Sequence, residues 1–133
     1  MSDSKSGVDE IIAEVLIEGL IDWTDPGWVL SSVVQMRPGT AKEERDEALT
    51  LIRTMLTEGF ATAGSITSDG KFVAWRLSPD KSADQIDDEF IREWGTELPT
   101  PGAIAWFQNT ALGDEIANRI IKNDEHGQPS QPS

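Results

Sequence analysis

The apolar residues of this chain change their spacing at Phe60, and the change restricts the folds that the chain can adopt. Up to that point they recur three and four positions apart, as on one face of an amphipathic helix. Beyond it they alternate with other residues in two runs, 60–66 and 71–77, on either side of the Asp69-Gly70 dipeptide. Asp-Gly between two alternating runs is a strong hairpin signal. The sequence therefore predicts helices followed by an antiparallel hairpin, and so an α+β fold.

Three helices are predicted before the hairpin, and each has a recognisable start. Two begin with the spacing of a capping box, in which a Ser or Thr precedes an acidic residue by three positions. The middle helix has a proline in its first turn, where the backbone N–H would have no partner in any case. A turn at 37–39 separates it from the third helix, whose apolar stripe is regular up to about residue 58. The three start signals are Ser6 with Asp9, Thr24 or Asp25 with Pro26, and Thr40 with Glu43.

Two helices and a strand are predicted after the hairpin. A fourth helix begins at Ser78-Pro79 and ends at Gly95. The short apolar run 103–107 is bounded by turn residues, so we expect a third strand beside the hairpin. Thr110 precedes a final amphipathic helix. The apolar positions of that helix, which could close the core or form a homodimer contact, are Leu112, Ile116 and Ile120.

The length of 133 residues suits one domain that buries a core without covalent cross-links. We expect a single globular domain at 8–122, a flexible N-terminus at 1–7, and a disordered tail at 123–133, where no apolar residue anchors the chain. The chain has no cysteine, which excludes disulfides, thiolate metal ligands and cysteine nucleophiles. It shows no signal peptide and no stretch near the ~20 apolar residues that cross a bilayer, so we expect a cytoplasmic protein.

Residues 8–77 resemble a winged-helix domain, a family in which two helices joined by a tight turn precede a β-hairpin called the wing. The turn would be the Arg-Pro-Gly-Thr stretch at 37–40, and the wing would span 60–77 with Ser-Asp-Gly at its tip. The segment LIRTMLTEGFATAG is similar to the junction where the third helix of that family runs into the wing. The resemblance implies a winged-helix-like fold extended by a helix, a short third strand and a C-terminal helix. It also implies two roles, because members of the family bind DNA through the third helix or serve as protein-binding modules.

Eleven basic residues against 24 acidic ones give the chain a net charge of −13. This charge repels nucleic acids and anionic membranes, and it attracts basic protein surfaces. The third helix, at 41–58, has three basic and five acidic residues, and four of the acids lie in its first turns, where a recognition helix approaches bases. We therefore expect a basic protein partner, with no nucleic acid and no membrane. Solubility alone is an equally simple reason for the acidity.

The sequence lacks the motifs that commonly carry chemistry. It contains no Gly-x-Ser-x-Gly, no phosphate-binding glycine loop and no His-Glu-x-x-His. The single histidine, His126, lies in the polar tail without packed partners. The acidic run from Asp80 fails as a calcium loop, because its sixth and twelfth positions hold Gln85 and Ile91 in place of Gly and Glu. We therefore predict no catalytic, cofactor-binding or metal-binding residues.

Acidic residues gather in two segments that could form an interaction surface. Residues 1–25 hold seven acids and one base, and residues 80–98 hold seven acids and two bases. If the first and fourth helices lie side by side, they make one strongly negative face. Two tryptophans flank the link between the first two helices, where they could be binding hot spots or part of the core. The candidate protein-interaction residues are Glu10, Glu14, Glu18, Trp23, Trp28, Asp84, Asp87 and Asp88.

The sequence leaves three functions open. The leading hypothesis is a non-catalytic protein-interaction module, such as an adaptor, an inhibitor or an immunity-type protein, that uses its acidic surface to bind a basic partner. The first alternative is a transcription regulator that binds DNA, which requires a basic stripe along the third helix or the wing. The second alternative is a small enzyme that uses carboxylates, which requires a pocket lined by two or more buried acids.

Overall fold

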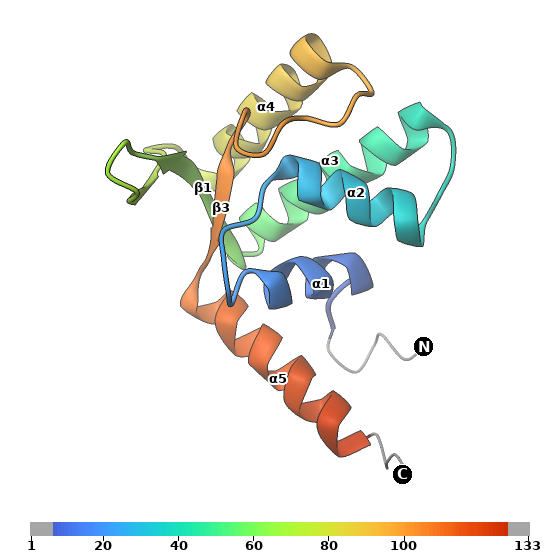
Figure 1. Cartoon of the computed structure of the whole chain (residues 1–133), viewed down its shortest axis with the longest axis vertical. Helices are drawn as coiled ribbons and strands as arrows, with labels where there is room; N and C mark the ends of the chain where they lie inside the picture. The colour runs from blue at the N-terminus through green and yellow to red at the C-terminus, as the bar shows by residue number, and fades with distance from the viewer. Residues whose placement is uncertain (1–6, 128–133) are drawn as a thin grey trace.

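The computed structural model describes residues 7–127, with side chains placed up to residue 124 (Figure 1). The described helical segments are α1 (Glu10–Glu18), α2 (Pro26–Met36), α3 (Ala41–Thr57), α4 (Pro79–Glu89), the π-helix η2 (Phe90–Trp94) and α5 (Ala111–Gly127). The described strands are β1 (Ala61–Ile66), β2 (Phe72–Ala74) and β3 (Trp106–Asn109). This content confirms the predicted α+β class, and the order of elements is consistent with a winged-helix-like fold.

The three strands form one antiparallel sheet in the order β2-β1-β3. The central strand is β1, in which Gly64 pairs with Ala74 of β2 and Ala63 pairs with Phe107 of β3. Thr24 extends the sheet beyond β3, because its backbone exchanges two hydrogen bonds with Phe107, at 3.1 and 2.7 Å. The link between α1 and α2 is thereby fixed to the sheet.

The predicted hairpin is confirmed, and Gly70 in its turn has a φ of 83°, a conformation that favours glycine. Its second strand is shorter than predicted, because β2 ends at Ala74 and does not reach Leu77. The chain turns away there to begin α4. Ser78 caps that helix by accepting a hydrogen bond from the N–H of Lys81 at 3.2 Å.

The start of α1 differs from the predicted capping box. Asp9 itself is the N-cap, and its Oδ1 accepts a hydrogen bond from the N–H of Ile11 at 2.8 Å. The prediction placed Asp9 one turn inside the helix, behind Ser6, which lies outside the described residues. Aspartate is among the most effective N-cap residues, so the helix begins directly after it. The start signals at Asp25 and Thr40 are confirmed by the structure.

The third strand and the last helix have different bounds from those predicted. β3 lies beside the hairpin as expected, but it begins at Trp106, because turns and bends continue through Ile104. α5 passes the predicted domain boundary at 122 and ends at Gly127. That boundary was inferred from the lack of apolar residues, which governs burial, whereas no proline interrupts the helix. The remainder of the predicted tail, 128–133, and residues 1–6 lie outside the described residues.

α3 is central to the helical part of the molecule. It packs against both α2 and α4, while α1 packs against α5 and α2 (Figure 1). The core includes Ile52 and Met55 of α3 together with Phe90 of η2, all fully buried. On α5, Ile116 is buried and Leu112 is exposed, so part of the predicted apolar stripe closes the core. α4 lies on one side of α2 and α3, and α1 lies on the other side, between them and α5 (Figure 1).

Candidate functional site

The predicted acidic residues do not form one surface. Glu10 and Glu14 are exposed on α1 and Glu18 is half-buried at its end, whereas Asp84 and Asp88 are exposed on α4. α1 packs against α5 and α2, and α4 packs against α3. The single negative face was expected only if the first and fourth helices lie side by side, and this condition is not met, because α2 and α3 separate them (Figure 1).

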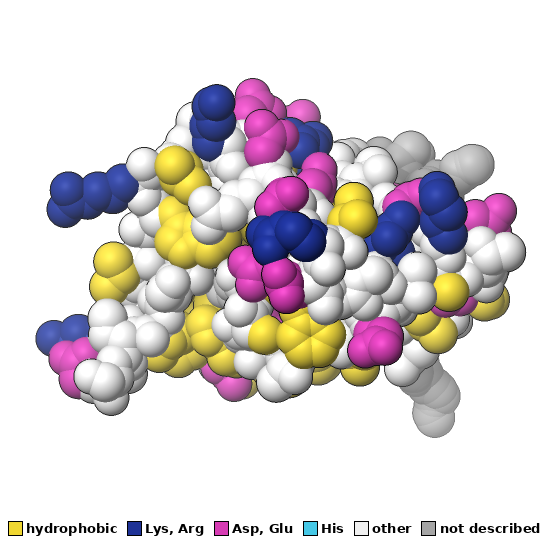
Figure 2. Space-filling view, turned by 90° about the horizontal axis from the view of Figure 1, so that it is seen from above, with side chains coloured by type: hydrophobic (Ala, Val, Ile, Leu, Met, Phe, Trp, Pro, Cys, Tyr) yellow, Lys and Arg dark blue, Asp and Glu magenta, His cyan; other side chains and the backbone are white. Residues whose placement is uncertain are grey.

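Two of the predicted acids on α4 are engaged inside the molecule. The Nη2 atom of Arg53, on α3, lies 2.8 Å from a carboxylate oxygen of both Asp84 and Asp87, and its Nη1 lies 3.7 Å from Asp80. The hydrogen bond with Asp87 is the main reason why the pKa of Arg53 is raised. Figure 2 looks onto this end of the molecule and shows basic side chains lying among acidic ones. Asp84 and Asp87 thus hold α4 to α3.

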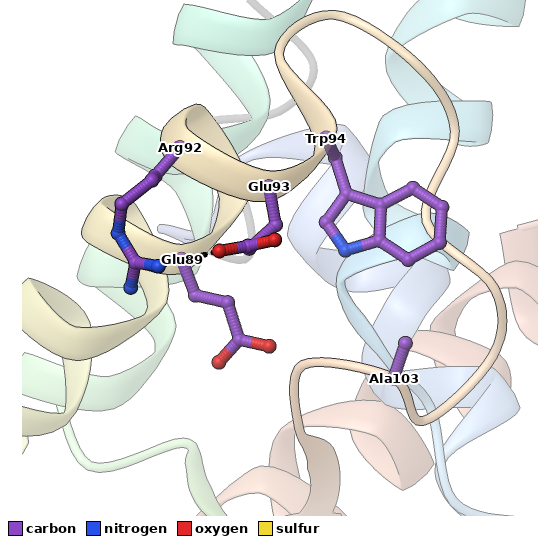
Figure 3. Close-up of a pocket in the computed structure, with 5 residues that line it drawn as sticks. All are labelled: Glu89, Arg92, Glu93, Trp94 and Ala103. Atoms are coloured by element: carbon purple, nitrogen blue, oxygen red, sulfur yellow. Dashed lines mark hydrogen bonds and ion pairs between the residues drawn. The ribbon is translucent and has the colours of Figure 1, made fainter.

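A pocket with acidic and aromatic walls lies where α4 passes into η2 (Figure 3). Its volume is about 390 Å³. The helix widens at this point, because the N–H of Gly95 donates to the carbonyl of Phe90, five residues earlier, at 3.0 Å. Such π-helical turns are rare and are frequently found at functional sites. The residues that line the pocket are Glu89, Arg92, Glu93, Trp94 and Ala103.

Among residues 7–124, the polar groups of this pocket are only partly satisfied. Arg92 donates to Asp88 at 2.8 Å and to Glu93 at 2.5 Å, and the bond to Asp88 is the main reason why the pKa of Arg92 is raised. Glu89 forms no ion pair within residues 7–124 and acts on Arg92 through space. The indole N–H of Trp94 has no hydrogen-bond partner in that range, and its ring stands across the pocket from both glutamates (Figure 3). A carboxylate beside an aromatic ring suits a cationic group.

The two glutamates of the pocket are not the buried pair that acid–base catalysis needs. The side chain of Glu93 is 54% exposed, and Glu89 is half-buried. A buried carboxylate is found instead at Asp25, the N-cap of α2, which accepts a hydrogen bond from the N–H of Gly27 at 3.1 Å. Burial raises the pKa of Asp25, against the opposing effect of backbone hydrogen bonds. These contacts give Asp25 a structural role, which is to cap the start of α2.

The two predicted tryptophans have different surroundings. Trp23 is half-buried, with its ring centre 6.4 Å from that of Trp106 and its Nε1 donating to Gln108 at 3.4 Å. Trp28 is exposed on α2, where Val34 is exposed as well. Packing against the sheet therefore accounts for Trp23, whereas Trp28 belongs to the molecular surface. The sequence predicted neither the exposure of Val34 nor the pocket beside Trp94.

The basic side chains of α3 are all paired with acids. Lys42 and Arg45 both bind Asp46, at 2.7 and 3.0 Å, and Arg53 binds the acids of α4. The hydrogen bond from Lys42 is the main reason why the pKa of Asp46 is lowered. Arg45 also donates to the carbonyl of Gly95 at 3.2 Å. The helix that a winged-helix protein would present to DNA therefore has no unpaired cation between residues 41 and 57.

In the part of the chain that the structure describes, no group of three or more His, Cys, Asp or Glu residues could hold a metal ion. The side chain of His126 lies outside that part. No described helix combines the length and the apolar composition that crossing a membrane requires. No protein-family model, curated protein or solved structure matches this chain.

Proposed function

We propose that this chain is a non-catalytic protein-interaction module, on a winged-helix-like scaffold, that binds a basic protein partner in the cytoplasm. An adaptor, an inhibitor and an immunity-type protein all fit this description. The binding surface is the acidic one around η2, which includes the pocket of Figure 3 and Asp88 at its edge. The acids of α1 form a separate surface that this interaction does not require.

The distribution of ion pairs carries this proposal. The chain has 24 acidic residues but only 11 basic ones, so most of its carboxylates have no cation of their own. Opposite charge on a partner speeds encounter and selects among partners. Six of the basic residues are already used inside the molecule, since each of them lies within 3.0 Å of a carboxylate. They are Arg37, Lys42, Arg45, Arg53, Arg92 and Arg119.

The surface around η2 is favoured over α1 because it adds an aromatic group to the acids. Lys and Arg side chains bind well where a carboxylate and an aromatic face are both within reach. Trp94 and Glu89 provide that combination in one pocket. α1 has exposed glutamates but no aromatic residue. Tryptophan is also enriched among the residues that dominate interface energetics.

A pull-down tests the proposal directly. The tagged chain is incubated with nuclease-treated lysate of its source at low salt, and bound proteins are identified by mass spectrometry before and after a high-salt wash. We expect one basic protein that is retained at low salt and released at high salt, because exposed charges are screened as the Debye length falls. Retention of no basic protein, or of a partner that salt does not release, would contradict the proposal.

DNA binding is the second candidate, and the hairpin is the observation that favours it. Lys71 and Arg76, in and after the hairpin, form no ion pair within residues 7–124, so they could contact phosphates. Fluorescence anisotropy with labelled duplex DNA at low salt separates the two candidates. Binding that weakens with salt and is lost in Lys71→Ala/Arg76→Ala would favour a DNA-binding regulator. We expect no binding, since α3 has no unpaired cation to support the wing.

A further inference from the structure

α2 differs from the rest of the molecule in its charge. Its 11 residues include no Asp, Glu, Lys or Arg, in a chain of which 26% is charged. The helix nevertheless reaches the surface, where Trp28 is 43% exposed, Val34 44% and Met36 41%. The centres of protein interfaces are depleted in charge and enriched in Trp and Met relative to the remaining surface. The exposed positions of α2 have this composition, and Val34 is the one of these three that lines a groove.

A groove of about 300 Å³ lies beside Val34. Leu30 and Val34 line it from α2, Glu44 lines it from α3, and Leu98 lines it from the segment that follows η2. Leu98 is 56% exposed, so a large apolar side chain stands in water at the edge of the groove. The groove adds a concave apolar feature to the uncharged helix.

The segment that holds Leu98 is fixed against α2. A Cβ atom at Gly27 would lie 2.7 Å from the carbonyl oxygen of Pro99 and 3.7 Å from the Leu98 side chain, so the segment packs directly on the start of the helix. At the beginning of the same segment, Arg45 donates to the carbonyl of Gly95. The groove is therefore formed before any partner arrives, which lowers the ordering cost of binding.

The groove has a negatively charged surround. Glu44 lines it, with one carboxylate oxygen accepting a hydrogen bond from the N–H of Gly39 at 3.0 Å. Glu97 is exposed between Thr96 and Leu98, which both line the groove. Arg45 follows Glu44 in α3, but its side chain is only 12% exposed and is held by Asp46 and the Gly95 carbonyl. A second copy of the chain, with its own net charge of −13, would bring like charges together. An apolar segment flanked by basic residues fits both the groove and its surround.

We propose that the groove is the docking face for an amphipathic basic segment of the protein partner. Its apolar side chains enter the groove between Val34 and Leu98, and its lysines or arginines meet Glu44 and Glu97. This inference rests on the proposed function. The acidic pocket of Figure 3 would bind charged groups of the partner, and the groove would bind its apolar side chains. The mode is that of a helix lying in a groove.

The test uses two synthetic peptides of leucine and lysine with the same composition. In one the leucines recur three and four positions apart, and in the other they are dispersed. Each is titrated into the ¹⁵N-labelled chain, and amide shifts are mapped. We expect the patterned peptide to shift α2 and the residues around Leu98, and Leu98→Ser to weaken its binding about tenfold. Leu112→Ser, at a 43% exposed leucine on α5, is the matched control and leaves binding unchanged.

Equal effects of Leu98→Ser and Leu112→Ser, or shifts confined to α1 and α4, would overturn the docking face. If both peptides bind equally at the acids around η2, the docking face is refuted while the proposed function stands. If neither peptide binds, the docking face is refuted, and the pull-down decides the proposed function separately. A second copy of the chain is the other possible occupant of the groove, and sedimentation of the chain alone tests for it. A dimer that Val34→Ser abolishes would assign the groove to that second copy and overturn the proposal.

Discussion

Asp25 shows how one residue serves the fold at a cost to stability. It caps α2 beside the groove, accepting a hydrogen bond from the N–H of Gly27, and it is 6% exposed. Burial raises its pKa above the ordinary value of 3.8. The contribution of such a group to stability is fully present below the unfolded pKa and is lost as the pH rises through the folded pKa. The contribution of Asp25 to stability is therefore smaller at neutral pH than at acid pH.

Substitution of Asp25 separates its cap from its charge. Asp25→Asn keeps a side-chain acceptor and removes the titration, so its stability relative to the wild type should increase as the pH rises. Asp25→Ala loses the cap and should lower the free energy of unfolding by about 1 kcal/mol. Urea unfolding of the three proteins between about pH 4 and pH 8 measures both effects. Parallel pH curves for the wild type and Asp25→Asn would show that burial does not raise this pKa.

The sequence predicted the role of a single residue well where its hydrogen-bond partner lies only a few positions away. Thr40 and Glu43 form the expected capping box, because both partners lie in the same turn of the helix. The Asp69-Gly70 turn also forms as expected. The capping box predicted for α1 was wrong because Asp9 is itself a strong N-cap. Spacing alone cannot show whether an aspartate is the N-cap or lies three residues after the N-cap.

Between elements, Arg53 adds ion pairs to the packing of α3 against α4. Its guanidinium reaches Asp84 and Asp87, which lie 31 and 34 residues further along the chain. Sequence spacing reveals ion pairs three or four residues apart on one helix, and it does not reveal pairs between helices. For the same reason the sequence predicted the helices themselves but not that α2 and α3 separate α1 from α4. The groove was missed as well, because its walls, which include Val34 and Leu98, come from segments far apart in the sequence.

Removing the guanidinium of Arg53 tests this contact. Arg53→Met retains an apolar stem and leaves three carboxylates without their cation. We expect the free energy of unfolding to fall by about 1 kcal/mol at low salt and by less at high salt, because the side chain is partly exposed and screened. Arg92→Met is the control, since its bond to Asp88 is exposed and within one helical stretch, and its effect should be smaller. Equal losses in the two variants would mean that Arg53 does not join the helices.

At the scale of the whole molecule, excess negative charge opposes folding. Acids that lack a cation repel one another, and the Debye length of about 30 Å at 0.01 M salt lets this repulsion act across the molecule. Raising the salt to about 0.1 M shortens that length to about 10 Å. We expect the Tm of the wild type to rise by a few degrees. Arg53→Met should show a larger rise, and a lower Tm at high salt would mean that ion pairs outweigh the repulsion.

Composition predicted the class of molecule but could not locate a surface on it. The change of apolar spacing at Phe60 and the alternating runs around Gly70 were sufficient for the α+β class. The excess of acids predicted the sign of the charge on a partner. The place of binding depends on which carboxylates remain unpaired after folding, and Glu89 and Asp84 differ in this respect although both lie on α4.

The central claim is that a particular acidic surface binds a basic protein, and two double variants of equal charge test it. Glu89→Gln/Glu93→Gln alters the pocket of Figure 3, and Glu10→Gln/Glu14→Gln removes the same charge from α1. The measurement is the amount of basic protein that each retains at low salt in the pull-down. We predict that the first variant loses most of it and that the second keeps nearly the wild-type amount. Equal retention by the two variants would contradict the claim, because it would mean that binding depends on the total charge of the chain and not on one surface.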